Sequence, residues 1–552
     1  MMNRKDIIDS LGQTFDLLIV GGGVTGAGAA RDAARRGLKT IVLDMNDLAF
    51  GTSSRSSKLV HGGLRYLEHA EFALVFESVS ERRILMDIAP HLVTAQGFLF
   101  PVFKDSRRSL WEINIGMWLY DGLSLFRSPK MHKSLSKAKL KKEEPALRQK
   151  DLKGAPLYYD CATDDARLTL ESAIDAQAHG AVIATYMKVL SFIKEDTRVV
   201  GVKVRDELTG EHYEVRAHAV VNATGPWSDR TRGLGKDEVK KRLRPTKGIH
   251  IVVPTEKLRL NNAIVCFHPV DGRVLFAIPW GDRTYIGTTD TDYQEDPGVV
   301  CASFEDVDYL VNVSNHYFPD CNLKLEDVIS TWAGVRPLVL DEKSNDESAT
   351  SREHVLSIDE DGLINIAGGK LTTYRKMAAE IVEKSVEYLR YIGKLPKVRA
   401  SNTADEALPG AVGWPEEGGT EWIENEVRRK IGQRLDPQSI SLLVKTYGMR
   451  SIDVVELLDK DERLADRILE DRPEIMAQVH FAMEKEIALT VRDVLIRRTQ
   501  IFFRDSNQGL DCVDRVVDYM ARYLNWDESQ KTREKEEYLR EVERSRAWRK
   551  KA

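Results

Sequence analysis

Cysteine is scarce in this sequence, and its spacing excludes the usual cysteine-based sites. The chain has five cysteines, an odd number, and none forms a Cys-x-x-Cys pair. A disulfide framework and a zinc or iron–sulfur centre held by cysteines are therefore not predicted. We expect a protein of a reducing compartment, with no bound metal.

Neither a strong charge excess nor a long hydrophobic run is present. The net charge is −5 over 552 residues, without the basic excess that nucleic-acid binding requires. The most apolar run, residues 181–193, contains Lys188 and is shorter than the about 20 apolar residues of a membrane span. Residues 1–13 contain no apolar stretch typical of a secretory signal. We therefore expect a cytoplasmic protein with no nucleic-acid partner, and only peripheral contact with any membrane.

The length of the chain predicts two or three domains, because 552 residues exceed what one hydrophobic core supports. From Leu408 onward, helix-forming residues with amphipathic spacing replace the earlier glycine-rich pattern. We expect a separate all-α domain there, with a boundary near residues 395–410.

The N-terminal part carries the pattern of a dinucleotide-binding unit. Residues 15–20 form an apolar run typical of a buried parallel strand, and an alanine-rich helix is predicted over 24–36. Between them, Gly21, Gly23 and Gly26 fit Gly-x-Gly-x-x-Gly, which brings a pyrophosphate close to the helix N-terminus. Asp44 follows the next strand and is placed to accept from a ribose hydroxyl. The pattern predicts nucleotide binding and does not by itself separate NAD from FAD.

Two later glycine turns favour a flavin. Residues 220–227 and 364–378 each read as a strand ending in a glycine turn, and the second turn leads into a helix. Gly368 and Gly369 would then lie at a helix N-terminus, whose positive dipole end stabilises negative charge on a reduced isoalloxazine ring.

Several long motifs carry a resemblance to a known family. They are, in order, VGGGVTGAGAARDAARRGL, TSSRSSKLVHGGLRYLEH, VNATGPW, GIHIVVP, GTTDTDY, GVRPL and GGKLTTYRK. Together they resemble the FAD-dependent glycerol-3-phosphate dehydrogenases over nearly the whole chain. The implied fold class is α/β: a glutathione-reductase-like FAD-binding domain, a D-amino-acid-oxidase-like mixed α+β substrate domain and an all-α C-terminal domain. The expected boundaries are 1–72, 155–232 and 330–395 for the FAD-binding domain, 73–154 and 233–329 for the substrate domain, and 400–552 for the helical domain.

The resemblance also implies which residues contact FAD. Beside the three fingerprint glycines and Asp44, the expected cofactor contacts come from the donor-rich segment after the second strand and from the two later turns. They are Thr52, Ser53, Ser57, Lys58, Leu59, His61, Gly225, Trp227, Gly368, Gly369, Lys370, Leu371 and Thr372.

A phosphate-bearing substrate would need cationic donors, and the fork of arginine suits a phosphate best. The candidates are Arg65, Tyr66, Arg336 and Arg352. The resemblance implies oxidation of sn-glycerol 3-phosphate to dihydroxyacetone phosphate, with hydride transfer to flavin N5 and loss of the hydroxyl proton to a base.

His250 is the expected base or positioning donor, because imidazole titrates near the operating pH. A buried core histidine without a catalytic role is the alternative. Lys370 is the second candidate, as a group that stabilises the developing alkoxide or the reduced flavin.

The expected electron acceptor is a membrane quinone. Residues 107–142 combine aromatic side chains with flanking basic charge, as in a helix that rests on anionic lipid; an ordinary packed helix is the alternative. The protein is then expected at the inner face of the cell membrane, with a homodimer possible. The alternative functions are a soluble glycerol-3-phosphate oxidase using oxygen, an amino-acid-oxidase-like flavoenzyme, and a non-catalytic nucleotide-binding scaffold.

Overall fold

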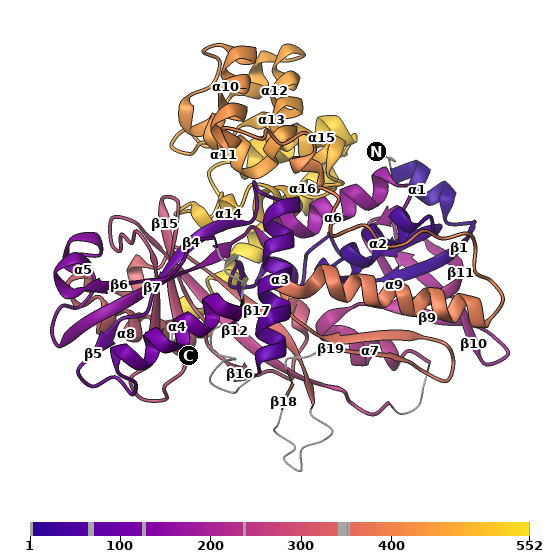
Figure 1. Cartoon of the computed structure of the whole chain (residues 1–552). Helices are drawn as coiled ribbons and strands as arrows, with labels where there is room; N and C mark the ends of the chain where they lie inside the picture. Colours follow the sequence, from indigo (N-terminus) through magenta and orange to yellow (C-terminus); the bar gives the residue numbers. More distant parts are fainter. Residues whose placement is uncertain are drawn as a thin grey trace.

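The computed structural model describes residues 4–63, 71–123, 129–235, 239–340, 350–351 and 354–550. These residues form two lobes, each built on a sheet, with a group of helices above their junction (Figure 1). Within the described ranges, no helix has both the length and the apolar character needed to cross a membrane.

The first sheet forms the dinucleotide-binding lobe. It has eight strands in the order β19-β20-β11-β1-β2-β8, with β10 and β9 continuing from β11. Neighbouring strands run parallel from β20 to β8. The strands are β1 (Thr14–Val20), β2 (Thr40–Leu43), β8 (Val182–Ala184), β9 (Met187–Glu195), β10 (Arg198–Asp206), β11 (His212–Asn222), β19 (His354–Ile358) and β20 (Ile364–Gly368).

Strand register brings the glycine turns of this lobe to one edge. Val20 pairs with both Leu43 and Asn222, and Asn222 pairs with Asn365. The carboxyl ends of β1, β2 and β11 are therefore level, and β20 continues past them to Gly368 at the same edge, which is where open parallel sheets bind ligands. Helices α2 (Val24–Arg36), α6 (Asp165–Ala178) and α9 (Tyr374–Tyr391) belong to the same lobe, with α2 packed against the other two.

The second sheet forms the substrate lobe. It has twelve strands in the order β18-β17-β12-β15-β14-β13-β4-β7-β3, with β16 beside β12 and both β5 and β6 beside β7. The strands are β3 (Leu59–Val60), β4 (Thr94–Leu99), β5 (Val102–Phe103), β6 (Lys133–Ser136), β7 (Leu152–Ala162), β12 (Leu243–Pro254), β13 (Ala263–Phe267), β14 (Val274–Trp280), β15 (Arg283–Gly287), β16 (Thr291–Asp292), β17 (Ser330–Leu340) and β18 (Thr350–Ser351). Its helices are α3 (Phe72–Ile88), α4 (Leu110–Leu123), α5 (Lys137–Glu143) and α8 (Phe304–Tyr317).

Sheet membership differs from the expected boundaries in three places. Residues 330–340 were expected in the FAD-binding domain, but β17 pairs antiparallel with β12 along ten residues of the second sheet. Residues 59–60 also pair there, with β7, and β7 itself crosses the expected boundary at residue 155. Backbone pairing between strands far apart in the sequence decides this membership, and local pattern does not reveal it.

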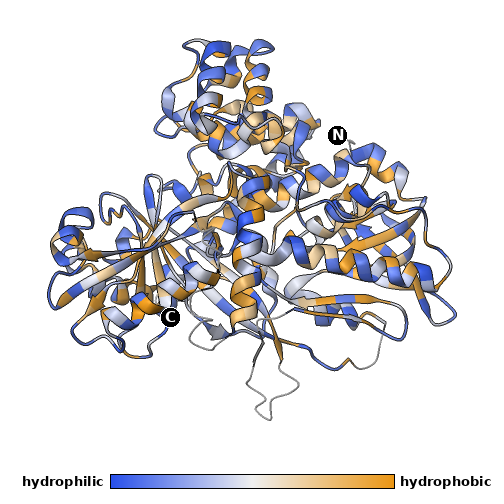
Figure 2. Cartoon of the chain, in the orientation of Figure 1, coloured by the Kyte–Doolittle hydropathy of each residue, from blue (hydrophilic) through white to orange (hydrophobic). Residues whose placement is uncertain are grey.

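The helical C-terminal domain lies above the junction of the lobes (Figure 1). Its helices are α10 (Gly419–Ile431), α11 (Pro437–Tyr447), α12 (Ser451–Glu456), α13 (Met476–Lys485), α14 (Ile501–Arg504), α15 (Val513–Leu524) and α16 (Glu528–Ser545), with a π-helical segment at Asp493–Arg498. Its buried apolar side chains are continuous with those of the substrate lobe, since Phe503 of α14 packs edge-on against Trp332 of β17. In Figure 2 these helices alternate between hydrophobic and hydrophilic faces, whereas the sheet strands are mostly hydrophobic.

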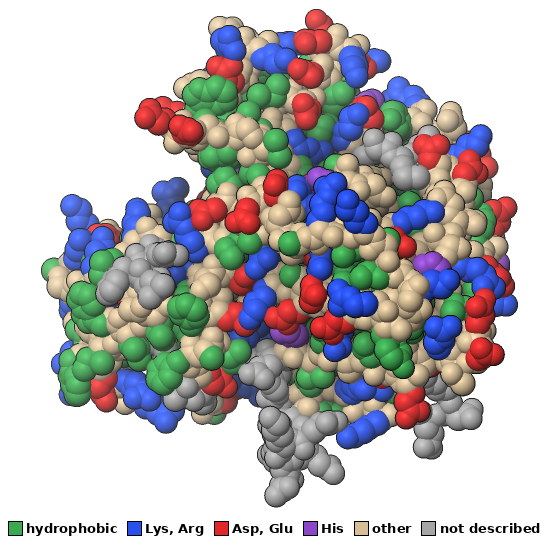
Figure 3. Space-filling model, turned by 45° about the vertical axis from the view of Figure 1, so that its right-hand side comes forward, with side chains coloured by type: hydrophobic (Ala, Val, Ile, Leu, Met, Phe, Trp, Pro, Cys, Tyr) green, Lys and Arg blue, Asp and Glu red, His purple; other side chains and the backbone are tan. Residues whose placement is uncertain are grey.

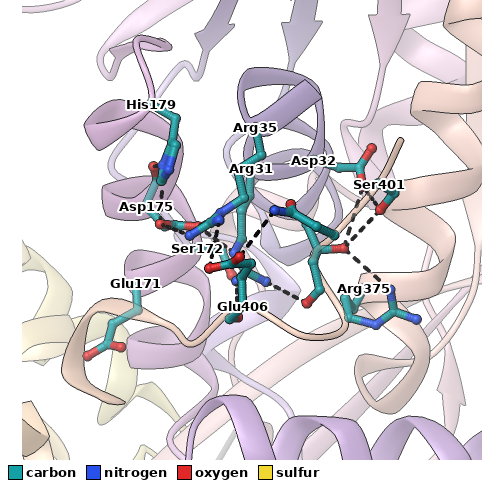
Figure 4. A network of polar contacts seen from close by, with 12 residues as sticks. Arg31, Asp32, Arg35, Glu171, Ser172, Asp175, His179, Arg375, Ser401 and Glu406 are labelled. Carbon is teal, nitrogen blue, oxygen red and sulfur yellow. Dashed lines mark hydrogen bonds and ion pairs between the residues drawn. The ribbon is translucent and has the colours of Figure 1, made fainter. Parts of the chain in front are cut away.

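The segment that connects the lobes to the helical domain is held by a polar network (Figure 4). Arg31 of α2 donates to Asp175 of α6 at 2.6 Å and to the Glu406 carbonyl at 2.5 Å. Ser401 bonds Asp32, also on α2. The linker is thus attached to the dinucleotide-binding lobe by buried charged groups, which are costly to separate once formed.

Candidate functional site

A cavity of about 420 Å³ lies along the edge where the glycine turns meet. It is lined by the turns after β1, β2, β11 and β20 and by the segment 50–56. Of the residues expected to contact a cofactor, it brings together Gly21, Gly23, Asp44, Thr52, Ser53, Gly225, Trp227, Gly368, Gly369, Lys370 and Leu371.

The glycines of the first turn are required by close backbone approach. Gly21 has φ +112°, and a Cβ there would lie 2.6 Å from the Ala223 carbonyl oxygen. A Cβ at Gly26 would lie 1.9 Å from the Gly21 carbonyl oxygen. Gly23 lines the cavity directly and caps α2 without a side-chain hydrogen bond, so the helix N-terminus is open to an anion. Ser53 Oγ accepts from Val24 N at 2.9 Å at the same place.

Asp44 is oriented by backbone donors. Its carboxylate accepts from Gly22 N at 2.5 Å and from Asn46 N at 2.8 Å. Burial raises the pKa of Asp44 to about 6, although these two hydrogen bonds act in the opposite direction. The protonation state of Asp44 therefore changes near pH 6, a pH at which binding experiments can be carried out.

A second cavity, of about 800 Å³, meets the first at the turn after β20. Both are lined by Thr52, Pro337 and the run 368–370. The second cavity also has Ser57, Leu59, His61 and Arg336 in its wall, together with Thr288 and Thr289. It continues between aromatic side chains to α4, where Ile113, Gly116, Met117 and Leu119 line it.

Arg336 presents a guanidinium group to the second cavity. It lies on β17 and donates to Asp290 Oδ1 at 2.9 Å, Thr288 Oγ1 at 3.0 Å and the Thr289 carbonyl at 3.2 Å. Its side chain remains 32% exposed, so the fixed cation is accessible from the cavity. A second arginine, Arg273, lines the same cavity and donates to the Asp290 carbonyl at 2.5 Å.

His250 is buried behind the cavity wall. It is 3% exposed, and neither cavity is lined by it; its Nε2 lies 2.9 Å from the hydroxyl of Ser57, which does line the larger cavity. The imidazole stacks on Trp332 with ring centroids 4.8 Å apart. Burial, with the charges of Arg336 and Lys58, lowers the pKa of His250 well below its usual value of 6.5. The lowered pKa favours the neutral ring, and the Ser57 hydroxyl lies between this ring and the larger cavity.

Two of the expected cofactor residues have their side chains engaged elsewhere. Lys58 is buried and bonds Asp165 at 2.6 Å, and Thr372 Oγ1 accepts from His61 N at 3.1 Å. Arg65, Tyr66 and Arg352 lie outside the described residues. Among those residues, no group of three or more His, Cys, Asp or Glu side chains is arranged to hold a metal ion.

Sequence reasoning missed Arg273 and the acceptors that hold Arg336. These are the Thr288 hydroxyl and the Thr289 backbone carbonyl, both within the motif GTTDTDY. Arg273 has no motif around it, and only the pairing of β14 beside β15 brings it to the cavity.

Comparison with known proteins identifies the two parts of the chain. Residues 16–375 match the family described as FAD dependent oxidoreductase, and residues 401–531 match the C-terminal domain of alpha-glycerophosphate oxidase. The chain is 38% identical over 547 residues to the aerobic glycerol-3-phosphate dehydrogenase of Staphylococcus haemolyticus, covering 98% of this chain and 96% of the relative. It is 34% identical over 585 residues to the alpha-glycerophosphate oxidase of Streptococcus pneumoniae, covering 94% of each.

A solved structure gives the same result. The glycerol-3-phosphate dehydrogenase of Bacillus halodurans, determined in complex with FAD, superposes with a TM-score of 0.81 at 34% identity, covering 98% of this chain and 97% of that one. A dinucleotide-binding sheet whose cavity opens onto a second, sheet-walled cavity defines a flavoprotein oxidoreductase of the D-amino-acid-oxidase type. The chain belongs to the FAD-dependent glycerol-3-phosphate dehydrogenase family.

The residues present fit FAD, the cofactor of this family. The open helix N-terminus after Gly23 suits a pyrophosphate, the Asp44 carboxylate suits a ribose, and the glycine turn at 368–369 leaves room beside Lys370 for a ring system.

We expect FAD affinity to fall as the pH drops below about 6, because a protonated Asp44 loses acceptor capacity for ribose hydroxyls. The loss should approach about tenfold per pH unit below that point. Flavin fluorescence during titration of the apoprotein between pH 5 and 8 measures it. Asp44→Asn should bind FAD more weakly at pH 8 and show no such pH dependence; an unchanged slope in this variant would exclude Asp44 as the titrating group.

Proposed function

We propose that the protein oxidises sn-glycerol 3-phosphate to dihydroxyacetone phosphate and passes the electrons to a quinone at the membrane. The observation that carries the substrate assignment is the position of Arg336, a fixed cation in the wall of the cavity that meets the cofactor cavity at 368–370. The names of the two relatives, a glycerol-3-phosphate dehydrogenase and an alpha-glycerophosphate oxidase, support the same substrate.

Bound FAD supplies the two-electron acceptor for the hydride that leaves C2 of the substrate. Arg336 binds the phosphate and orients the substrate. Ser57 takes the C2 hydroxyl proton while passing its own proton to Nε2 of the neutral His250. Lys370, at the meeting point of the two cavities, stabilises negative charge that develops on the C2 oxygen.

Anaerobic mixing with sn-glycerol 3-phosphate tests the substrate assignment. The absorbance of the oxidised flavin near 450 nm should fall on roughly the time scale of one turnover. Bleaching by a D-amino acid or glycine, with none by the phosphate ester, would establish an amino-acid oxidase instead. A yellow protein that no substrate bleaches would support a non-catalytic scaffold.

Arg336→Gln should lower kcat/KM for sn-glycerol 3-phosphate about 100-fold or more, since a charge-assisted phosphate contact is lost and the substrate is no longer held in register. FAD content should stay unchanged. Steady-state kinetics with the purified holoenzyme measure the effect. Arg205→Gln removes an exposed arginine of the dinucleotide-binding lobe and is the matched control; equal kinetics in the two variants would contradict the phosphate assignment.

The quinone assignment is supported by the outer face of α4. Trp111 and Trp118 are 66% and 58% exposed, lie seven residues apart on one face of the helix and are outside the cavity wall. Ile115 and Leu119 lie beside them, 58% and 43% exposed, and line the cavity where it meets this face. Figure 3 shows hydrophobic side chains gathered on the lobe that carries this helix. Basic residues at 107–108 and from Lys130 onward flank the helix, as expected of a helix resting on anionic lipid.

The inner face of α4 supports the same acceptor. The larger cavity extends from Lys370 to this helix, and its far end is lined mainly by apolar and aromatic side chains. A hydrophobic acceptor leaving the bilayer at α4 would therefore have an apolar path toward the cofactor. This geometry favours a protein bound peripherally to the inner face of the cell membrane.

Trp118→Glu, combined with Trp111→Glu, should abolish co-sedimentation with anionic vesicles and lower quinone turnover, because two charges would enter the lipid boundary. Anaerobic flavin reduction should be unchanged. Trp422→Glu changes a comparably exposed tryptophan of α10 and is the control. Wild-type protein that stays in the supernatant and turns over with oxygen as fast as with a quinone analogue would establish the soluble oxidase.

A further inference from the structure

A third cavity lies where the two lobes meet the helical domain. It is small, about 60 Å³, and all three parts of the chain contribute to its wall. Its charged lining residues are Arg55, Arg492, Arg497, Arg544 and Glu541. Four arginines thus face one glutamate, which is an unusual excess of positive charge for a cavity inside a protein of net negative charge.

Most of these arginines have a carboxylate partner. Arg497 bonds Asp47 at 2.5 Å and Asp493 at 2.7 Å, Arg544 bonds Glu541 at 2.8 Å, and Arg492 bonds Glu537 at 3.1 Å. The buried Nε of Arg492 nevertheless has no hydrogen-bond partner.

Arg55 is the exception. Its guanidinium lies 5.2 Å from the ring centre of Phe50, and within the described part of the chain it has no hydrogen bond or ion pair. Burial lowers the pKa of Arg55; Glu541 acts against this, whereas Arg497 and Arg544 lower it further. The Arg55 side chain is partly buried and close to the charges of Arg497 and Arg544, so an anion bound beside it would offset their mutual repulsion.

We propose that this cavity binds a small tetrahedral oxyanion, the chemistry shared by inorganic phosphate and the phosphate group of a monoester. Arg55 would supply the fork of donors that phosphate prefers, and the charges of Arg492, Arg497 and Arg544 surround the same cavity. The volume admits a phosphate group and is too small for a nucleoside.

Such a site would connect the cofactor to the helical domain. Arg55 follows Thr52 and Ser53, which line the cofactor cavity, and it faces Arg544 of α16 across the third cavity. An anion held by both sides would restrain the segment 52–55 and slow the loss of FAD.

Thermal unfolding of the holoenzyme, followed by flavin fluorescence, tests the proposal. Inorganic phosphate at constant ionic strength, balanced with chloride, should raise the unfolding midpoint by about 2 °C or more and slow FAD release. Arg55→Gln should lose both effects while keeping its turnover with sn-glycerol 3-phosphate. Arg205→Gln, the exposed arginine control, should keep both effects.

Two further arms separate this site from the proposed substrate site. Arg336→Gln should retain the response to phosphate. If Arg336→Gln loses it and Arg55→Gln keeps it, phosphate binds only at the substrate site and the proposal is wrong; it is equally wrong if phosphate stabilises no form of the protein. Glycerol 2-phosphate in place of phosphate identifies the source: an equal, Arg55-dependent response indicates a monoester, and a response to phosphate alone indicates the free ion.

Discussion

His250→Ala is expected to lower kcat for sn-glycerol 3-phosphate about 100- to 10,000-fold, the range typical of losing a general base. The side chain is the buried partner of Ser57, at 2.9 Å, and without it the C2 hydroxyl proton has no acceptor beyond the cavity wall. Stopped-flow flavin reduction under anaerobic conditions measures the step directly. The flavin content should be unchanged, because His250 lines neither cavity of the described structure.

The pH profile provides the second readout. Since burial and two neighbouring cations hold the pKa of His250 well below 6.5, the imidazole is unprotonated throughout the neutral range. The rate of flavin reduction should therefore be flat from pH 6.5 upward and fall only at lower pH, and the fall due to His250 should vanish in the variant. His212→Ala, on the exposed end of β11, is the control. An undiminished rate in His250→Ala would leave Lys370 as the candidate and make His250 a core residue.

Asp47→Ala is expected to destabilise the protein by about 3–5 kcal/mol, the range for removing one partner of a buried ion pair. Asp47 is fully buried and accepts from Arg497 at 2.5 Å and from Arg498 at 2.6 and 2.9 Å. Burial alone would raise the pKa of Asp47, but Arg498 and Arg497 outweigh it and the pKa is lowered. Truncation leaves two buried guanidinium groups with one acceptor fewer.

The lost stability should appear mainly as weaker attachment of the helical domain to the dinucleotide-binding lobe. Asp47 lies in the segment after β2, beside the cofactor cavity, whereas both arginines belong to the C-terminal domain. FAD release during urea denaturation reports on the dinucleotide-binding lobe. The far-ultraviolet circular dichroism, recorded over the same urea range, reports on the helices. Glu195→Ala breaks the pair between the exposed side chains of Glu195 and Arg216 and should cost less than about 1 kcal/mol. Equal losses in the two variants would show that the Asp47 contact contributes little to stability.

The dinucleotide-binding unit could be predicted almost residue by residue. The expected helix over 24–36 and the strand over 40–43 agree with α2 and β2, and the expected strand over 15–20 begins one residue earlier. Apolar runs, a helix ending at Gly37 with φ +95° and a glycine turn are all local features, so a single stretch of sequence specifies them. The FAD-dependent family followed from the same local motifs, and the comparisons confirm it.

The relation between His250 and the cavity could not be predicted in this way. Ser57 and His250 are 193 residues apart, and their contact exists because the segment after β2 packs on β12 and β17 of the other lobe. The sequence suggested a histidine at the site and a serine at the cofactor. The structure instead places the serine between the histidine and the larger cavity.

The sequence by itself determined the family, the cofactor and the existence of a helical C-terminal domain, since each is encoded in contiguous motifs or in local composition. Only the tertiary structure decided that β17 belongs to the second sheet, that Arg273 joins Arg336 at the cavity, and that four arginines from two parts of the chain surround the third cavity. The physical reason is the range of the interactions: strand pairing and charge clustering join residues tens to hundreds of positions apart, and no local pattern records which partners meet.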